Sequence, residues 1–143
     1  MQAFLEHLAT LCCALFCGAA IYINAVEHPA RMSCGIKAAL AEWAPSYKRA
    51  TTMQASLAVS GFLFACAAWF VGSGTWILIA GVILVSVAPF TLLVIMPTNR
   101  RLLALDADKD VAEAGVLLDR WNLLHGVRSA LSLVALSIFL LVT

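Results

Sequence analysis

The chain has 143 residues, of which 63% are hydrophobic and 12% are charged, whereas an ordinary soluble domain carries roughly 25% charged residues. This composition excludes a typical water-soluble fold and leaves room for one compact domain that is solvated largely by membrane lipid. The formal net charge is only +1, and no basic patch is interleaved with aromatic residues, so no nucleic-acid partner is expected.

Apolar segments in chain order predict four transmembrane helices in a single domain, residues 1–143. The first helix covers about residues 4–27 and is followed by a polar loop, 28–50. No Asp, Glu, Lys, Arg or His occurs between Arg49 and Arg100, a length that crosses a bilayer twice at roughly 20 residues per span. The Gly72-Ser73-Gly74 sequence divides this stretch into helices at about 52–71 and 75–96. A second polar loop, 97–121, and a helix at about 122–142 complete an all-α, four-helix membrane bundle.

Prolines and loop patterns refine these boundaries. Pro29, Pro45 and Pro97 fall at predicted helix ends or in loops, and Pro89 lies inside the third helix, where a kink is expected. The apolar spacing within loop 97–121 is typical of a short amphipathic helix on the membrane surface, and a solvated connector explains it equally well.

The distribution of positive charge predicts the orientation in the membrane. Both polar loops are expected to be cytoplasmic and both termini to face the non-cytoplasmic side, because loops rich in Lys and Arg stay inside. In a bacterial cell this membrane would be the cytoplasmic (inner) membrane, which the chain crosses several times. The nine basic residues, all in the loops or just inside the last helix, are Arg31, Lys37, Lys48, Arg49, Arg100, Arg101, Lys109, Arg120 and Arg128.

Polar side chains gather at the predicted cytoplasmic end of the helices. Polar groups inside spans are costly and therefore mark candidate functional sites. Asn24, Glu27 and His28 share one face at the end of the first helix, because they are spaced three and four residues apart. A bundle with short loops would bring all these groups around one interfacial cavity. The last helix contributes Trp121, His125 and Arg128 on one face, the third helix ends near Asn99, the first loop adds Trp43 and Tyr47, and Gln54 stands at the start of the second helix.

Several of these residues also have ordinary explanations. The tryptophans and Tyr47 fit an aromatic belt, Glu27 fits an ion pair with a neighbouring arginine, and His28 fits a helix stop. His125 and Arg128 are the strongest functional candidates, because each interrupts a helix that is otherwise apolar to its end.

Four short motifs together resemble the anthrone oxygenase-like family of small four-helix membrane proteins, which is also known as a bacterial domain of unknown function. The resemblance implies a monooxygenase that converts an anthrone to an anthraquinone with molecular oxygen, without flavin or haem. The expected substrate is then a flat, hydrophobic, polyketide-like small molecule. The motifs are Gly18-x-x-x-Tyr22-x-Asn24-x-x-Glu27-His28-Pro29, the segment Trp43 to Arg49, Pro97-Thr98-Asn99-x-x-Leu102, and Arg120-Trp121-x-x-x-His125-x-x-Arg128.

The implied chemistry assigns roles to the candidate residues. A base with a pKa near neutrality is needed to remove the acidic ring proton, which makes His125 the first candidate and His28 the second. Arg128 and Asn99 are expected to stabilise the resulting oxyanion. No nucleotide-binding or haem-attachment motif occurs, so no organic cofactor is expected. Substrate contacts are expected from Asn24, Glu27, Trp43, Tyr47 and Trp121.

Two other classes of function compete with this hypothesis. Glu27, His28 and His125 form the ligand set of a facial triad for iron, or a site for copper, in a metal-dependent membrane oxidase. Two of these ligands are adjacent in the sequence, which makes simultaneous coordination awkward. A small accessory protein without catalytic activity, whose polar face docks a partner, is the third possibility.

Overall fold

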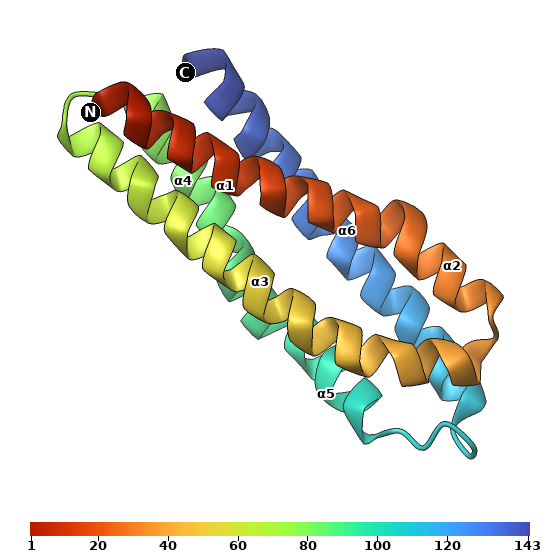
Figure 1. Ribbon diagram of the computed structural model, residues 1–143. Helices are drawn as coiled ribbons and strands as arrows, with labels where there is room; N and C mark the ends of the chain where they lie inside the picture. The colour runs from red at the N-terminus through yellow and green to blue at the C-terminus, as the bar shows by residue number, and fades with distance from the viewer.

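The computed structural model describes all residues, 1–143, and consists of four long helices without strands (Figure 1). Each is long and apolar enough to cross a membrane, which confirms the all-α class with four spans. Both termini lie at the same end of the bundle as the turn between α3 and α4 (Figure 1). In chain order the elements are α1 (Gln2–Tyr22), the π-helix η1 (Ile23–Glu27) and α2 (His28–Ser33); α3 (Ile36–Phe70); α4 (Thr75–Phe90), the π-helix η2 (Thr91–Ile95) and α5 (Met96–Ala104); and α6 (Val111–Val142).

The helices are longer than predicted. They contain 30 to 35 residues each, which corresponds to about 45–53 Å at 1.5 Å per residue and exceeds a hydrocarbon core of about 30 Å. Most of the predicted loops 28–50 and 97–121 are helical, and the connections shrink to residues 34–35 and 105–110. The separate amphipathic helix considered for the second loop is absent; its residues extend α5 and α6 instead. One end of the bundle therefore projects beyond the hydrocarbon.

Pro29 and Pro97 do not end helices, contrary to the prediction. Each lies two residues past the last residue of a π-helical turn, Pro29 after η1 and Pro97 after η2. A proline cannot donate its backbone nitrogen and crowds the carbonyl four residues earlier. A π-helical turn relieves this conflict because its hydrogen bonds reach five residues along the chain. Pro45 also lies inside a helix, α3, and Pro89 lies inside α4 as predicted.

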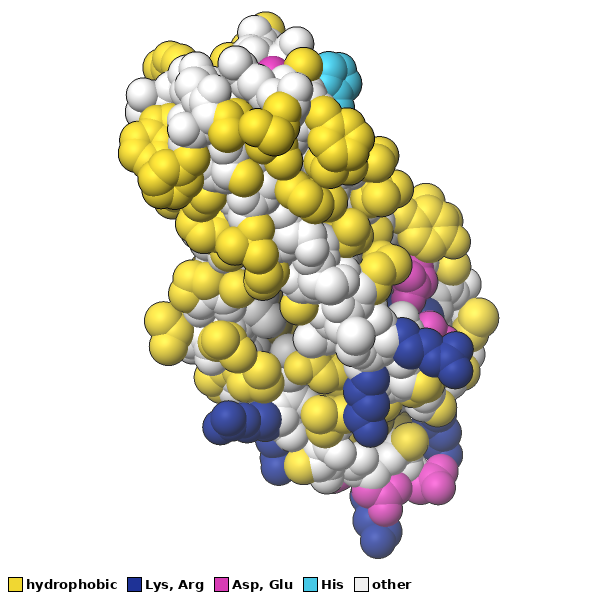
Figure 2. All heavy atoms as spheres, turned by 60° about the vertical axis from the view of Figure 1, so that its left-hand side comes forward, with side chains coloured by type: hydrophobic (Ala, Val, Ile, Leu, Met, Phe, Trp, Pro, Cys, Tyr) yellow, Lys and Arg dark blue, Asp and Glu magenta, His cyan; other side chains and the backbone are white.

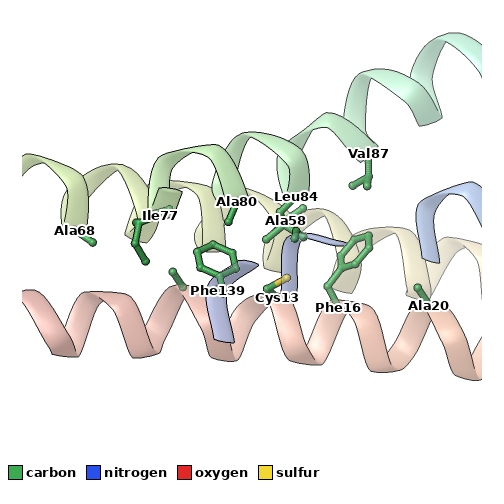
Figure 3. Packing of buried hydrophobic residues seen from close by; sticks show 13 residues of the cluster. Cys13, Phe16, Ala20, Ala58, Ala68, Ile77, Ala80, Leu84, Val87 and Phe139 are labelled. Atoms are coloured by element: carbon green, nitrogen blue, oxygen red, sulfur yellow. The ribbon is translucent and has the colours of Figure 1, made fainter. Parts of the chain in front are cut away.

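The buried face of α6 follows one regular seam. Its buried residues alternate in steps of four and three, the spacing that keeps a straight apolar seam against neighbouring helices. The polar members lie in the middle of the seam, between two apolar clusters. One cluster includes Phe16, Leu84 and Phe139 (Figure 3), and the other surrounds Trp43 and Trp121 near the charged end. The seam consists of Ala114, Leu118, Trp121, His125, Arg128, Ser132, Ala135 and Phe139.

Two glycines set the spacing between α3 and α4. A Cβ atom added to Gly81 would lie 2.7 Å from the Cβ atom of Ala65, and one added to Gly61 would lie 2.7 Å from Cδ2 of Leu84. Small residues at such contacts let membrane helices approach closely. Beyond Val87, α4 bends away (Figure 3). The two helices are therefore tight near the turn at 71–74 and splayed towards α5.

Charged side chains gather at one end of the bundle, and the rest of the visible surface is mainly apolar (Figure 2). The opposite end carries few polar contacts, such as the hydrogen bond of 2.7 Å that Ser73 Oγ donates to Glu6 Oε1. Large apolar residues such as Leu63, Leu93 and Leu123 are exposed on the sides. This surface fits lipid around the middle of the helices and water at the charged end.

Candidate functional site

A small buried cavity, called here the polar cavity, lies where α2, α3 and α6 meet. Its volume is about 10 Å³, enough for about one water molecule. The structure thus brings together five of the residues singled out from the sequence: Tyr47, Gln54, Trp121, His125 and Arg128. The polar and aromatic side chains that line it are Arg31, Ser46, Tyr47, Thr51, Gln54, Trp121, His125 and Arg128.

His125 is held by aromatic stacking rather than by hydrogen bonds. The side chain is 2% exposed, and its ring stacks on Trp121 with centroids 4.9 Å apart and an interplanar angle of 24°. The backbone of Ala20 approaches the ring without the geometry of a hydrogen bond, and neither ring nitrogen has a partner. Both ring nitrogens of His125 are therefore unengaged by the protein.

Arg128 is a buried cation that forms no ion pair with a carboxylate. The residue is 9% exposed, and Nη2 donates a hydrogen bond of 2.5 Å to Oε1 of Gln54. Its guanidinium also lies over the ring of Phe16, 5.6 Å from the centroid. Nε of Arg128 and Nε2 of Gln54 remain without hydrogen-bond partners. This arrangement favours a bound acceptor oxygen, above all an anionic one.

Three aromatic rings pack against one another beside the polar cavity. Trp43 stacks on Tyr47 with centroids 5.0 Å apart and meets Trp121 edge to face at 5.9 Å. Trp121 in turn lies against His125, so the rings pack on one another as a continuous wall. Their position explains how His125 is oriented, because each ring fixes the next by packing.

Arg31 is the main site residue that sequence reasoning missed. It is 6% exposed, pairs with Glu27, and forms a second ion pair in which Nε lies 2.6 Å from Oε2 of Glu42. Its guanidinium lies 5.8 Å from the ring centroid of Trp121. Glu27 also accepts a hydrogen bond of 2.6 Å from Ser46 Oγ. The pairing of Glu27 with a neighbouring arginine was one of the interpretations left open, and the spacing of four residues between Glu27 and Arg31 is the signal that would have identified the partner.

Gln54 has a larger role in the site than its position in the sequence suggested. It is 1% exposed and is the hydrogen-bond acceptor for the buried guanidinium of Arg128. A polar residue in a long stretch without charges was the signal, because polar groups inside a span are rare and usually functional.

Asn24, His28 and Asn99 lie outside the polar cavity. Asn24 donates a hydrogen bond of 2.7 Å to Asn122 Oδ1 and accepts one of 2.6 Å from Ser129 Oγ, which ties η1 to α6. His28 is buried with its ring centroid 5.9 Å from that of Trp121, and it does not line the cavity. Asn99 is 1% exposed, and its side-chain amide has no hydrogen-bond partner.

No three His, Cys, Asp or Glu side chains are grouped closely enough to hold a metal ion. The alternative metal set of Glu27, His28 and His125 is therefore not assembled in this conformation. The carboxylate of Glu27 instead contacts Arg31 and Ser46.

A second cavity, called here the lateral cleft, lies between α3 and the splayed part of α4 and η2. Its volume is about 170 Å³, and its walls are mainly apolar. It shares Thr51, Gln54 and Arg128 with the polar cavity, so the two are adjacent. The other lining residues are Phe16, Ala55, Ala58, Val87, Ala88, Thr91, Leu92 and Met96.

The fold and the site define a small four-helix integral membrane protein with an enclosed histidine and arginine near one end of its spans. The model of the anthrone oxygenase family matches residues 43–138, a range that contains Gln54, His125 and Arg128. The chain belongs to the anthrone oxygenase family, which confirms the resemblance seen in the sequence motifs.

One similar protein is the anthrone oxygenase tpcL of Aspergillus fumigatus. It is 46% identical over 61 residues, which cover 41% of this chain and 38% of that protein. The match thus spans well under half the length of this relative. No solved structure matches the chain.

Proposed function

We propose that the protein is an oxygenase that oxidises a flat hydrophobic aromatic ketone of the anthrone type with molecular oxygen. One observation carries the proposal: His125, with free ring nitrogens, and Arg128, without a carboxylate partner, line the same buried cavity. Membership of the anthrone oxygenase family supports the reaction type. The remaining steps follow from the chemistry of the substrate and the positions of these side chains.

In the first step, His125 removes a proton from the CH₂ group between the two aryl rings of the anthrone. The electron pair of the broken C–H bond delocalises onto the ketone oxygen, and the guanidinium of Arg128 stabilises this oxyanion. Trp121 holds the imidazole in place by stacking. His28 and the amide of Asn99, which the sequence also suggested as base and oxyanion donor, lie outside the polar cavity, so the proposal rests on His125 and Arg128.

In the second step, the electron-rich carbon reduces molecular oxygen and forms a C–O bond to give a peroxide. Loss of the second proton from that carbon and cleavage of the O–O bond release water and leave a new carbonyl group. One anthrone and one O₂ thus give one anthraquinone and one water. The substrate supplies all four electrons, so the proposed reaction uses no flavin, haem or metal.

Oxygen uptake by purified, metal-stripped protein with 9-anthrone tests this proposal. We expect anthraquinone formation to fall by roughly a hundred- to ten-thousand-fold in His125→Ala, the usual contribution of a general base. His7→Ala is the matched control, because His7 is exposed and lies near the other end of the first long helix. Full activity in His125→Ala would refute the assignment of the base.

The same experiment separates the competing classes of function. Activity that is restored only by stoichiometric iron or copper would favour the metal-dependent oxidase with Glu27, His28 and His125. No uptake above the spontaneous rate, with and without metal, would favour another substrate or a role as an accessory protein.

We also propose that the charged end of the bundle faces the cytoplasm and both termini face the other side. Basic residues are concentrated at that end, which the positive-inside rule assigns to the cytoplasm. In a bacterial cell the membrane would be the inner membrane. The polar cavity would then lie near the cytoplasmic leaflet.

A further inference from the structure

The lateral cleft has a structural cause at each end of α4. Near the turn at 71–74, the close contact at Gly81 draws α3 and α4 together. At the other end, Pro89 and the π-helix η2 follow one another where α4 bends away from the bundle (Figure 3). Bends at proline and π-helical turns are built into the backbone. The cleft is therefore a fixed feature of the fold rather than a chance gap between side chains.

The cleft combines apolar walls with a polar floor. Ala55 and Ala88 leave open space along its sides, and Phe16 closes one part of it. Gln54 and Arg128 belong to its lining, and both are at least nine-tenths buried. Nε of Arg128 and Nε2 of Gln54 donate no hydrogen bond. Buried donors without partners cost free energy until an acceptor arrives, so the cleft fits an apolar molecule that carries an oxygen at its leading edge.

The position of the cleft along the helices determines the side from which a ligand arrives. The cleft residues of α3, from Thr51 to Ala58, follow the last charged residue of that helix, Arg49, by two to nine residues, or about 3–14 Å along the helix axis. Ala55 and Leu92, which line the cleft, are exposed on the side of the bundle where the chain carries no charge. The cleft thus opens towards lipid hydrocarbon rather than towards water.

At the charged end, the layer of side chains around Trp121 is tightly packed. Arg31 is buried and paired with Glu27 and Glu42, and Trp43 is completely buried against Tyr47 and Trp121. A flat aromatic molecule would have to displace this packed layer to reach His125 from the aqueous side.

We infer that the lateral cleft takes up a flat, oxygen-bearing polycyclic molecule directly from the membrane and presents its oxygen to Arg128 and Gln54. This inference rests on the proposed function, because it names the substrate class and route for the same site. The cleft is smaller than the usual 300 Å³ or more of a small-molecule pocket. It therefore encloses the leading rings of the ligand while the rest stays in lipid.

Equilibrium binding of 1,8-dihydroxyanthraquinone to the full-length protein in lipid nanodiscs tests the inference through the shift of the dye's visible absorbance. Ala55→Phe and Ala88→Phe fill the cleft, and we expect each to raise Kd at least tenfold. Ala130→Phe is the matched control: it adds the same side chain to an exposed position of α6 that does not line the cleft, and Kd should stay within twofold.

Folding of each variant is checked by its thermal unfolding transition. If a phenylalanine variant does not fold, Ala88→Leu replaces it, and this smaller side chain should raise Kd by an intermediate factor. Equal Kd values for the cleft variants and Ala130→Phe would overturn the inference, and so would the absence of binding to the wild type above partition into empty nanodiscs.

The outcomes separate this inference from the proposed oxygenase activity. Weaker binding in the cleft variants together with no oxygen uptake by the wild type would support the binding site and refute the oxygenase. Normal oxygen uptake with unchanged KM in the cleft variants would support the oxygenase and refute the route through the cleft.

Discussion

Replacing Gly81 by alanine tests the close approach of α3 and α4. The new Cβ atom would lie 2.7 Å from the Cβ atom of Ala65, whereas carbon atoms in contact normally lie about 3.5–4.0 Å apart. No side-chain rotation relieves this clash, because both atoms are bonded directly to the backbone. The helices must therefore separate by about 1 Å, an overpacking that typically costs about 1–3 kcal/mol.

The gain in helix propensity from glycine to alanine offsets about 0.5–1 kcal/mol of that cost. We expect Gly81→Ala to lower the free energy of unfolding by about 0.5–2 kcal/mol, measured by SDS titration in mixed micelles. Gly61→Ala should cost less without being neutral, because its new Cβ atom would lie 2.7 Å from the rotatable end of Leu84 and 3.2 Å from the Cβ atom of Cys12. Gly126→Ala should be neutral or stabilising, because nothing lies within 4 Å of its added Cβ atom.

The order of these three variants is the decisive result. If Gly81→Ala unfolds at the same SDS fraction as Gly126→Ala, then α3 and α4 are not in close contact, and the physical cause given for one end of the lateral cleft is wrong.

Two further predictions concern the charged end. Glu27→Gln and Glu42→Gln should each lower the free energy of unfolding only slightly, because the other carboxylate still pairs with Arg31. The double substitution leaves a buried cation unpaired and should lower the free energy of unfolding by about 3–5 kcal/mol. Additive effects of the two substitutions on SDS unfolding would show that the carboxylates do not share Arg31. For orientation, a membrane-impermeant maleimide applied to intact cells should spare the exposed native Cys34 and label Thr143→Cys. The reverse pattern would invert the proposed topology.

The sequence predicted the number of spans and their order correctly because the bilayer imposes a strong local rule. A stretch without charges from residue 50 to 99, divided by Gly72-Ser73-Gly74, has few alternatives to a helical hairpin in lipid. The same rule identified His125 and Arg128, since ionisable groups inside an apolar helix stand out without any knowledge of their neighbours.

The ends of the helices could not be predicted in the same way. Proline near the end of an apolar run normally indicates a helix end, yet the first and third long helices continue past Pro29 and Pro97 through π-helical turns. Whether a proline ends a helix or is accommodated depends on packing that supports the wider turn, which a local pattern does not contain.

The sequence by itself determined the membrane class, the four spans, the gathering of charge at one end and the family. Only the tertiary structure decided which polar groups meet: Arg31 and Gln54 join His125 and Arg128, while Asn24 and Asn99 lie elsewhere. It also decided where α3 and α4 separate to form the lateral cleft. The physical reason is that span length follows from local hydropathy, whereas the rotation and bending of each helix follow from contacts with residues far away in the chain.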